Sequence, residues 1–253
     1  MRPPLRAVPA ALVLTVLCGS AAPAAAQASL PEGREVIARF IAAIGGRDAI
    51  LRHRARHFTG RFEATGQGIA GEFELYQAPP NRMVTTATLP GIGTVREGYD
   101  GTVAWTTNPA TGPMVLEGRA LDQRRHGAEF YLALYPPEMV ASVETVAEET
   151  FEGTPAWKVK VTTTWGESYA EYFDQATALQ LGSMRTLFTP MGEVEATSVV
   201  SDWRTVDGVR MPFRLVQRFA GIETVVTFSD LSLAPLPDSL FALPAEVRAL
   251  VGK

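Results

Sequence analysis

Residues 91–118 read GIGTVREGYDGTVAWTTNPATGPMVLEG, and they predict a two-stranded antiparallel ribbon near the middle of the chain. The strands are expected at 94–99 and 102–107, with the dipeptide Asp100-Gly101 between them. An Asp-Gly pair favours a type I′ turn, whose two central residues both need a positive φ. Residues 108–113 are rich in turn formers and are expected to form a loop. A two-stranded ribbon is only marginally stable by itself, so it predicts a larger sheet around it.

The rest of the chain supplies that sheet, because apolar and polar residues alternate through most of it. The alternation begins at His57 and recurs between short turns as far as Leu231. One of the predicted strands, at 143–146, is short. About eleven antiparallel strands in hairpin succession predict a mainly β fold with helices, built as a large curved antiparallel sheet or an incomplete β-barrel.

Helices are expected where apolar residues repeat at helical spacing or where an insertion interrupts the strands. The predicted helices lie at 31–44, within 47–56, within 118–135 and at 244–251. Gly45 and Gly46 end the first of them, as glycine does just past a helix. We expect the helical regions at 32–56 and 118–141 to form a lid over the mouth or the concave face of the sheet.

The N-terminal segment has the features of a secretory signal peptide. Arg2 and Arg6 give a positive start, residues 10–17 are apolar, and residues 24–26 are alanines suited to cleavage. The apolar run is too short for a permanent transmembrane helix. We therefore expect residues 1–26 to be removed on export.

The mature chain is expected to be residues 27–253, a single domain without cysteine. Cys18 follows Leu17, whereas a lipoprotein signal needs a small residue there, so Cys18 is assigned to the removed segment. Without Arg2 and Arg6 the basic side chains fall from 23 to 21 against 27 acidic ones, a net charge of −6. Such a charge argues against nucleic-acid binding, and the lack of another long apolar run argues against an integral membrane protein.

Three patterns suggest chemistry, and the surroundings of each argue against it. Residues 66–71 match the dinucleotide fingerprint, but an alternating strand follows where a helix is needed. His53 and His57 have a metal-binding spacing, but three arginines surround them and Arg54 replaces the expected glutamate, which favours two solvated histidines. Residues 166–170 approach a serine-hydrolase elbow but lack its last glycine. We therefore predict no catalytic residue, no metal and no cofactor.

The apolar residues that alternate inward along the strands are the candidate binding residues. Ordinary core packing explains any single one of them, but a barrel of this strand number leaves interior volume that side chains alone do not fill. The candidate ligand-binding residues are Phe62, Phe73, Leu75, Met83, Trp105, Val161, Trp165, Phe173, Leu181, Leu215 and Phe219. We expect them to share the concave face and to line an apolar cavity.

Several stretches resemble the periplasmic lipoprotein-carrier superfamily, the LolA/LolB-like outer membrane lipoprotein-sorting proteins. They are the helix ending in Gly-Gly at 32–46, YDGTVAWTTNP at 99–109, YFDQATALQLG at 172–182 and SDWRTVDGVRMPFRLV at 201–216. The resemblance implies a periplasmic protein with an unclosed barrel and a helical lid over an apolar cavity that holds acyl chains. The chain departs from it by a larger middle and by the lack of an anchoring cysteine, so it is more similar to the soluble carrier than to the anchored receptor.

The resemblance also implies a gating arginine, for which Arg61 and Arg82 are the candidates. Its implied function is a soluble periplasmic protein that binds a lipid or an acylated protein, with a role in transport to the outer membrane. Two alternatives stay open. One is a sensor or interaction module with a filled interior and an envelope-protein partner, and the other is a hydrolase on the same barrel, for which a nucleophile is missing.

Overall fold

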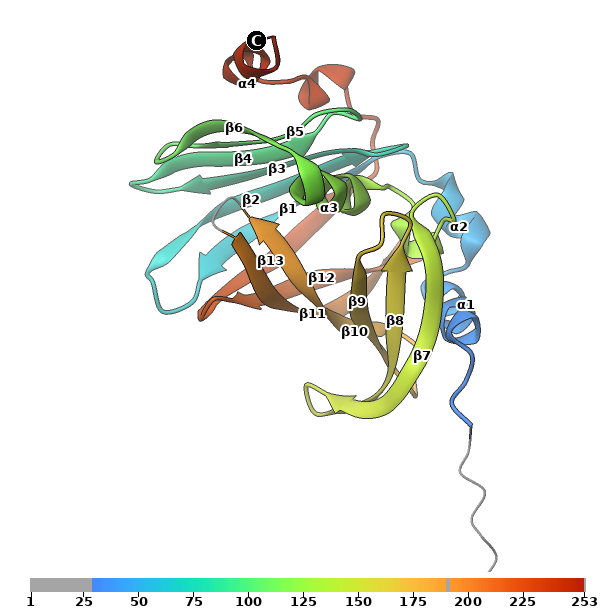
Figure 1. Ribbon diagram of the computed structural model, residues 1–253. Helices are drawn as coiled ribbons and strands as arrows, with labels where there is room; N and C mark the ends of the chain where they lie inside the picture. Colours follow the sequence, from blue (N-terminus) through green and yellow to red (C-terminus); the bar gives the residue numbers. More distant parts are fainter. Residues whose placement is uncertain (1–28, 190–191, 253) are drawn as a thin grey trace, which may run out of the picture.

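The computed structural model describes residues 29–189 and 192–252, so the predicted signal peptide and Cys18 lie outside the described residues. Thirteen strands form one antiparallel sheet in the order β6-β5-β4-β3-β2-β1-β13-β12-β11-β10-β9-β8-β7. The sheet curves strongly, and Figure 1 shows its two ends on either side of a central helix. Within the described residues the end strands β6 and β7 do not pair with each other, so the barrel is incomplete.

Almost every strand pairs with its neighbours in sequence, and the pairing of β1 with β13 joins the first half of the sheet to the second. The first half comprises β1 (Arg56–Ala64), β2 (Ile69–Ala78), β3 (Arg82–Leu89), β4 (Gly93–Tyr99), β5 (Ala104–Asn108) and β6 (Gly112–Leu116). The second half comprises β7 (Val140–Phe151), β8 (Thr154–Thr163), β9 (Ser168–Asp174), β10 (Gln180–Thr189), β11 (Gly192–Val206), β12 (Val209–Phe219) and β13 (Ile222–Ser232).

The helices cover both sides of this sheet. They are α1 (Gly33–Ala43), α2 (Arg47–Arg52), α3 (Gly118–Ala128), the 3-10 turn η1 (Leu132–Leu134), the 3-10 turn η2 (Asp238–Phe241) and α4 (Ala245–Val251). In Figure 1, α3 lies inside the curve, α1 lies beside β7, and α4 lies on the opposite side of β3–β6 from α3. No helix in the described ranges is long and apolar enough to cross a bilayer.

The amphipathic stripe of α1 explains its position against the sheet. Val36, Ile37 and Phe40 repeat at helical spacing and are buried. They belong to the largest apolar core, which also includes Phe58 of β1 and Phe228 of β13. This core lies on the concave side, so the predicted helical lid is confirmed.

Two glycines let the strands approach each other closely where the sheet curves. A Cβ atom on Gly60 would lie 2.2 Å from the carbonyl oxygen of Thr227, and one on Gly71 would lie 2.0 Å from the carbonyl oxygen of Thr88. Atoms cannot approach that closely, so any side chain at either position would push neighbouring backbone away. Glycine inside a strand commonly marks such a close approach.

The connection between β4 and β5 in the central hairpin differs from the predicted two-residue turn. Of the pair Asp100-Gly101 only Gly101 has a positive φ, at 109°, and β5 begins at Ala104 instead of Thr102. The side chain of Asp100 accepts hydrogen bonds from the backbone N–H groups of Thr102 and Val103, both at 2.8 Å. This Asx-type cap stabilises a longer loop, so the type I′ prediction is wrong.

Two edge strands differ from the sequence prediction. Residues 112–116, partly expected to be a loop, form β6, and the edge position tolerates Pro113 because one side of β6 needs no hydrogen bond. The predicted short strand at 143–146 is the middle of β7, which spans twelve residues. Its pairing with β8 shifts register twice, and each shift interrupts the period-two alternation on which the prediction depended.

Candidate functional site

An apolar cavity lies between the first two helices and the concave face of the sheet. Its volume is ≈ 260 Å³. The cavity is lined by Phe40, Ile44, Ile50, Arg56, Phe58, Leu75, Gln77, Ala133, Gln180, Trp203, Val209, Arg210, Met211, Pro212 and Phe228. These residues come from both halves of the sheet, so the cavity forms only when β1 and β13 are paired.

The helices provide one wall of this cavity. Phe40 of α1 contacts Phe173 and Trp203 of the sheet, with ring centroids 5.3 Å and 6.3 Å apart. The end of α1 is tied to β12, because the backbone N–H of Arg210 donates to the carbonyl oxygen of Ile44 at 2.9 Å. These contacts hold α1 against the sheet on one side of the cavity.

The polar side chains of the lining are two arginines and two glutamines. Arg56 donates from Nη1 to the carbonyl oxygen of Phe130 at 3.1 Å, and its guanidinium carbon lies 4.1 Å from the centroid of the Phe130 ring. Its Nε atom is buried and has no hydrogen-bond partner. Burial lowers the pKa of Arg56 to about 10, which leaves the group charged at neutral pH.

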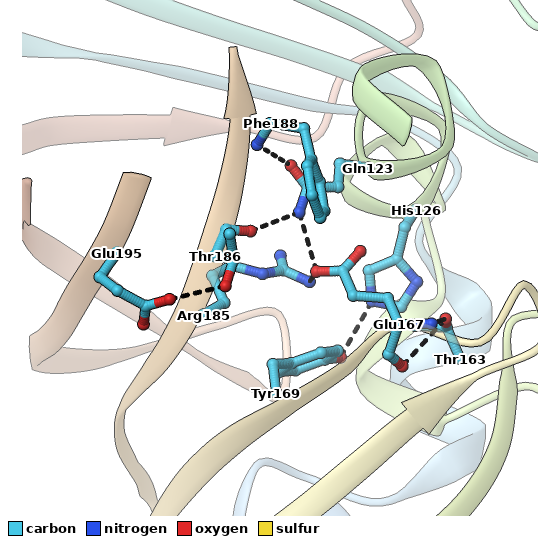
Figure 2. A network of polar contacts seen from close by, with 9 residues as sticks. All are labelled: Gln123, His126, Thr163, Glu167, Tyr169, Arg185, Thr186, Phe188 and Glu195. Carbon is cyan, nitrogen blue, oxygen red and sulfur yellow. Dashed lines mark hydrogen bonds and ion pairs between the residues drawn. The ribbon is translucent and has the colours of Figure 1, made fainter. Parts of the chain in front are cut away.

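A polar network attaches α3 to the second half of the sheet (Figure 2). It comprises Gln123, His126, Thr163, Glu167, Tyr169, Arg185, Thr186, Phe188 and Glu195. The side chain of Gln123 donates to Oε1 of Glu167 at 2.8 Å and to the carbonyl oxygen of Thr186 at 2.6 Å. It also accepts from the backbone N–H of Phe188 at 3.1 Å. One side chain therefore connects α3 to β10 and to the turn before β9.

His126 occupies the buried end of this network. Its Nε2 lies 3.0 Å from the hydroxyl oxygen of Tyr169, and the guanidinium carbon of Arg185 lies 4.2 Å from the Tyr169 ring centroid. Burial, together with the charges of Arg185 and Arg125, lowers the pKa of His126 to about 3. His126 is therefore neutral at physiological pH.

Glu171 of β9 lies on the same face of the sheet, two residues from Tyr169. The Tyr135 hydroxyl donates a hydrogen bond to its carboxylate. Burial raises the pKa of Glu171 to about 7, although the Tyr135 hydrogen bond and the charge of Arg185 act in the opposite direction. The concave face thus contains a carboxyl group that changes charge near neutral pH.

No protein-family model and no curated protein matches this chain, whereas solved structures do. A LolA superfamily protein from Nitrosomonas europaea matches at a TM-score of 0.55 and 15% identity, over 85% of this chain and 99% of that one. A putative outer membrane lipoprotein-sorting protein domain from Vibrio parahaemolyticus matches at a TM-score of 0.55 and 15% identity, over 83% of this chain and 95% of that one. The chain has the LolA-like fold. A DUF1329 family protein from Desulfovibrio piger matches at a TM-score of 0.55 and 12% identity, over 83% of this chain and 97% of that one.

The LolA-like sheet brings together most of the predicted binding residues. Phe62, Phe73, Leu75, Val161, Trp165, Phe173 and Leu215 belong to the main apolar core or pack against it on the concave side. Met83 lies on the same face, in a smaller cluster beneath α3 that includes Tyr99 and Ala128. Of all these residues, only Leu75 lines the apolar cavity.

Trp105 lies on the opposite face, so the prediction that it faces the concave side is wrong. In the β4–β5 hairpin, Tyr99 pairs with Ala104 on the concave face, so the next pair, Gly98 and Trp105, must point outward. Trp105 is fully buried there beneath the C-terminal segment, where it packs with Phe241 and Val247.

Leu181 and Phe219 also lie away from the cavity. A register irregularity between Gln180 and Gly182 turns Leu181 toward the convex face, where it packs with Phe151 and Tyr172. The prediction that Leu181 shares the concave face is therefore wrong. Phe219 pairs with Ile222 at the end of the β12–β13 hairpin, half-buried and outside the cavity lining.

The sequence did not reveal which residues line the cavity of this LolA-like fold. Ile50, Phe58, Met211 and Phe228 are lining residues that were not chosen as binding candidates. The helical stripe of α1 contained a usable signal, since it required an apolar partner surface, and Phe40 and Ile44 belong to it. The position of the opening along the sheet depends on the long-range pairing of β1 with β13, which no local pattern specifies.

The histidine pair is split between two environments. His53 is only 3% exposed, so the expectation that both histidines are solvated is wrong for it. Its Nε2 lies 3.4 Å from the carbonyl oxygen of Asp207, and burial lowers its pKa. His57 stacks on Tyr76, with ring centroids 4.1 Å apart. Within the described ranges, no group of three or more His, Cys, Asp or Glu side chains is placed to hold a metal ion.

Proposed function

We propose that this chain is a periplasmic binding protein that holds an acyl chain of a lipid or of an acylated protein in the apolar cavity. One observation carries the proposal: an apolar opening lies between a helical lid and the concave face of a LolA-like sheet. Binding needs no catalytic group, because each buried methylene contributes about 0.8 kcal/mol. The proposal includes removal of residues 1–26 and a single domain at 27–253.

The size of the cavity determines what fits without rearrangement. A volume of ≈ 260 Å³ is slightly below the roughly 300–1,000 Å³ of typical ligand pockets. The closed structure therefore suits one short alkyl chain. A longer chain needs displacement of α1 and α2, and the ligand must bind the open arrangement more tightly than the closed one to cause it.

A filling variant tests the proposal. Ala133 lines the cavity from η1, so Ala133→Phe places an aromatic ring inside it. We expect this variant to bind a fluorescent fatty acid at least about 10-fold more weakly than the unmodified protein, because the ring occupies part of the space of the chain. The measurement is a fluorescence titration, with circular dichroism to confirm that the variant is folded.

Ala38→Phe is the matched control. Ala38 is exposed on α1 and lines a separate groove between α1 and β7, with a volume of ≈ 410 Å³. The same chemical change there should leave the affinity unchanged. Equal affinities for all three proteins, or weakening only by Ala38→Phe, would contradict the assignment of the acyl chain to the apolar cavity.

The edge strand β7 favours a second candidate function, docking of an envelope protein. Within the described residues, β7 pairs with β8 on one side and with no strand on the other. An unpaired edge can accept an additional strand from a partner, and the groove beside α1 offers room for its side chains. A photocrosslinking residue at Ser142 should capture such a partner in cells. A signal that Ala38→Phe does not reduce would contradict docking in this groove.

A further inference from the structure

The charges around the apolar cavity all have one sign. Arg56 and Arg210 are the ionisable side chains in its lining, and neither Asp nor Glu is present there. The whole chain is acidic, with 27 Asp and Glu against 23 Lys and Arg. The cavity therefore concentrates positive charge in a protein whose net charge is −4.

Arg56 lacks the carboxylate partner that two other part-buried arginines have. Arg185 lies 3.5 Å from Glu167, and Arg124 pairs with Glu97. Arg56 contacts a backbone carbonyl oxygen and an aromatic ring, and it makes no ion pair with any residue in the described ranges. Its buried Nε is a hydrogen-bond donor without an acceptor.

A buried donor without an acceptor is unfavourable, and a buried charge without a counter-charge is more so. A bound carboxylate satisfies both needs, because a guanidinium presents its N–H groups in a fork that matches two carboxylate oxygens. Apolar walls next to Arg56, such as Phe58 and Leu75, suit the alkyl chain attached to that carboxylate.

We propose that the apolar cavity binds a free fatty acid, with its carboxylate held by Arg56 and its alkyl chain against the apolar walls. This inference rests on the proposed function and specifies the ligand class. It distinguishes a free acid from the acyl groups of a lipoprotein, which are esters or amides and carry no charge at the carbonyl end. Arg56 acts here as a binding residue whose charge selects the head group.

The test compares two ligands with the same chain and different heads, decanoic acid and decanol, by isothermal titration calorimetry at neutral pH. A hydrogen bond to a charged group predicts that the acid binds roughly 10- to 100-fold more tightly than the alcohol. Arg56→Gln should abolish this preference by lowering the affinity for decanoic acid to about that for decanol. Retained decanol binding also shows that the variant is folded.

Arg61→Gln is the matched control, because Arg61 is on the same strand but on the outer face, away from the cavity. It should retain the full preference for the acid. Equal affinity of the unmodified protein for acid and alcohol would overturn the head-group assignment and leave the acyl cavity intact. Binding of neither ligand would overturn the proposed function itself. A preference that persists in Arg56→Gln would overturn the role of Arg56.

Discussion

Tyr135 donates a hydrogen bond from its hydroxyl group to the carboxylate of Glu171, on the concave face of the sheet. Glu171 is 9% exposed, so its charged form has lost most of its contact with water. The residue that follows η1 is thereby connected to the middle of β9. A neutral Glu171 suits this position better than an ionised one, which is why burial raises its pKa to about 7.

This pKa predicts a pH dependence of stability. The folded protein keeps the Glu171 proton up to a pH of about 7, whereas the unfolded chain releases it near 4.5. The folded state therefore binds more protons between these values, and the free energy of unfolding falls as the pH rises through them. The loss attributable to Glu171 is about 3 kcal/mol. Glu171→Gln should remove it, which urea unfolding at several pH values would measure.

The pH dependence of stability that His126 contributes has the opposite sign, and it provides a control for the Glu171→Gln variant. The unfolded chain protonates this group near 6.5 and the folded protein only near 3, so the free energy of unfolding falls as the pH falls between those values. With Glu171 replaced, stability should rise with pH up to about 6.5 and then remain flat with respect to these two groups. A pH profile in Glu171→Gln identical to that of the unmodified protein would refute the buried-carboxyl interpretation.

Replacement of Trp105 should lower the stability of the fold without changing the affinity for ligand. Trp105 is fully buried on the convex side, so Trp105→Ala should lower the free energy of unfolding by about 3 to 5 kcal/mol. The fraction that remains folded should bind the fluorescent fatty acid with unchanged affinity, because Trp105 does not line the cavity. Urea unfolding and a probe titration measure the two quantities. Weakened binding at unchanged stability would show that our placement of Trp105 is wrong.

Two glycines should respond in opposite directions to replacement by alanine. Gly71→Ala places a Cβ 2.0 Å from the Thr88 carbonyl oxygen, and overpacking of this kind costs about 1 to 3 kcal/mol. A Cβ on Gly127 of α3 meets nothing within 4 Å, and alanine is favoured over glycine inside a helix by about 1 kcal/mol. Thermal unfolding should therefore show a lower midpoint for Gly71→Ala and a higher one for Gly127→Ala. The reverse order would be inconsistent with the packing of β2 against β3.

Gln123 should control how firmly α3 is held. Gln123→Ala removes three hydrogen bonds between α3 and the sheet, so amide hydrogen exchange in α3 should become faster while exchange in α1 is unchanged. Arg119→Ala is the matched control on the same helix, since its exposed pair with Glu193 contributes little and its contact with the Phe188 ring is not a hydrogen bond. Equal acceleration by the two variants would argue against a special role for Gln123.

The sequence predicts the architecture of this protein well because most of its strands show period-two alternation. The helical stripe that includes Phe40 predicts a helix packed on the sheet, and the structure confirms it. Alternation fails where the sheet is irregular. The register shifts in β7 and the irregularity beside Leu181 each move side chains to the other face, and neither has a signature in the local residue pattern.

The candidate site could be predicted only in part, for a physical reason. Strand alternation indicates that residues such as Phe73 and Leu75 share a face, but it does not indicate which part of that face stays open. The opening depends on how the helices lie across a sheet of thirteen strands. The role of Arg56 could not be predicted from the sequence either, because its lack of a carboxylate partner appears only once the strands around it are assembled.

The most direct test of the acyl-binding proposal is lipid extraction from the natively purified protein, followed by quantitative mass spectrometry. We expect single-chain lipid in stoichiometric amounts with the unmodified protein and with Ala38→Phe, and much less with Ala133→Phe. A clean extract from the unmodified protein, together with no binding of added fluorescent fatty acid, would contradict an acyl-binding cavity. That result would support the alternative in which the β7 edge docks a protein partner.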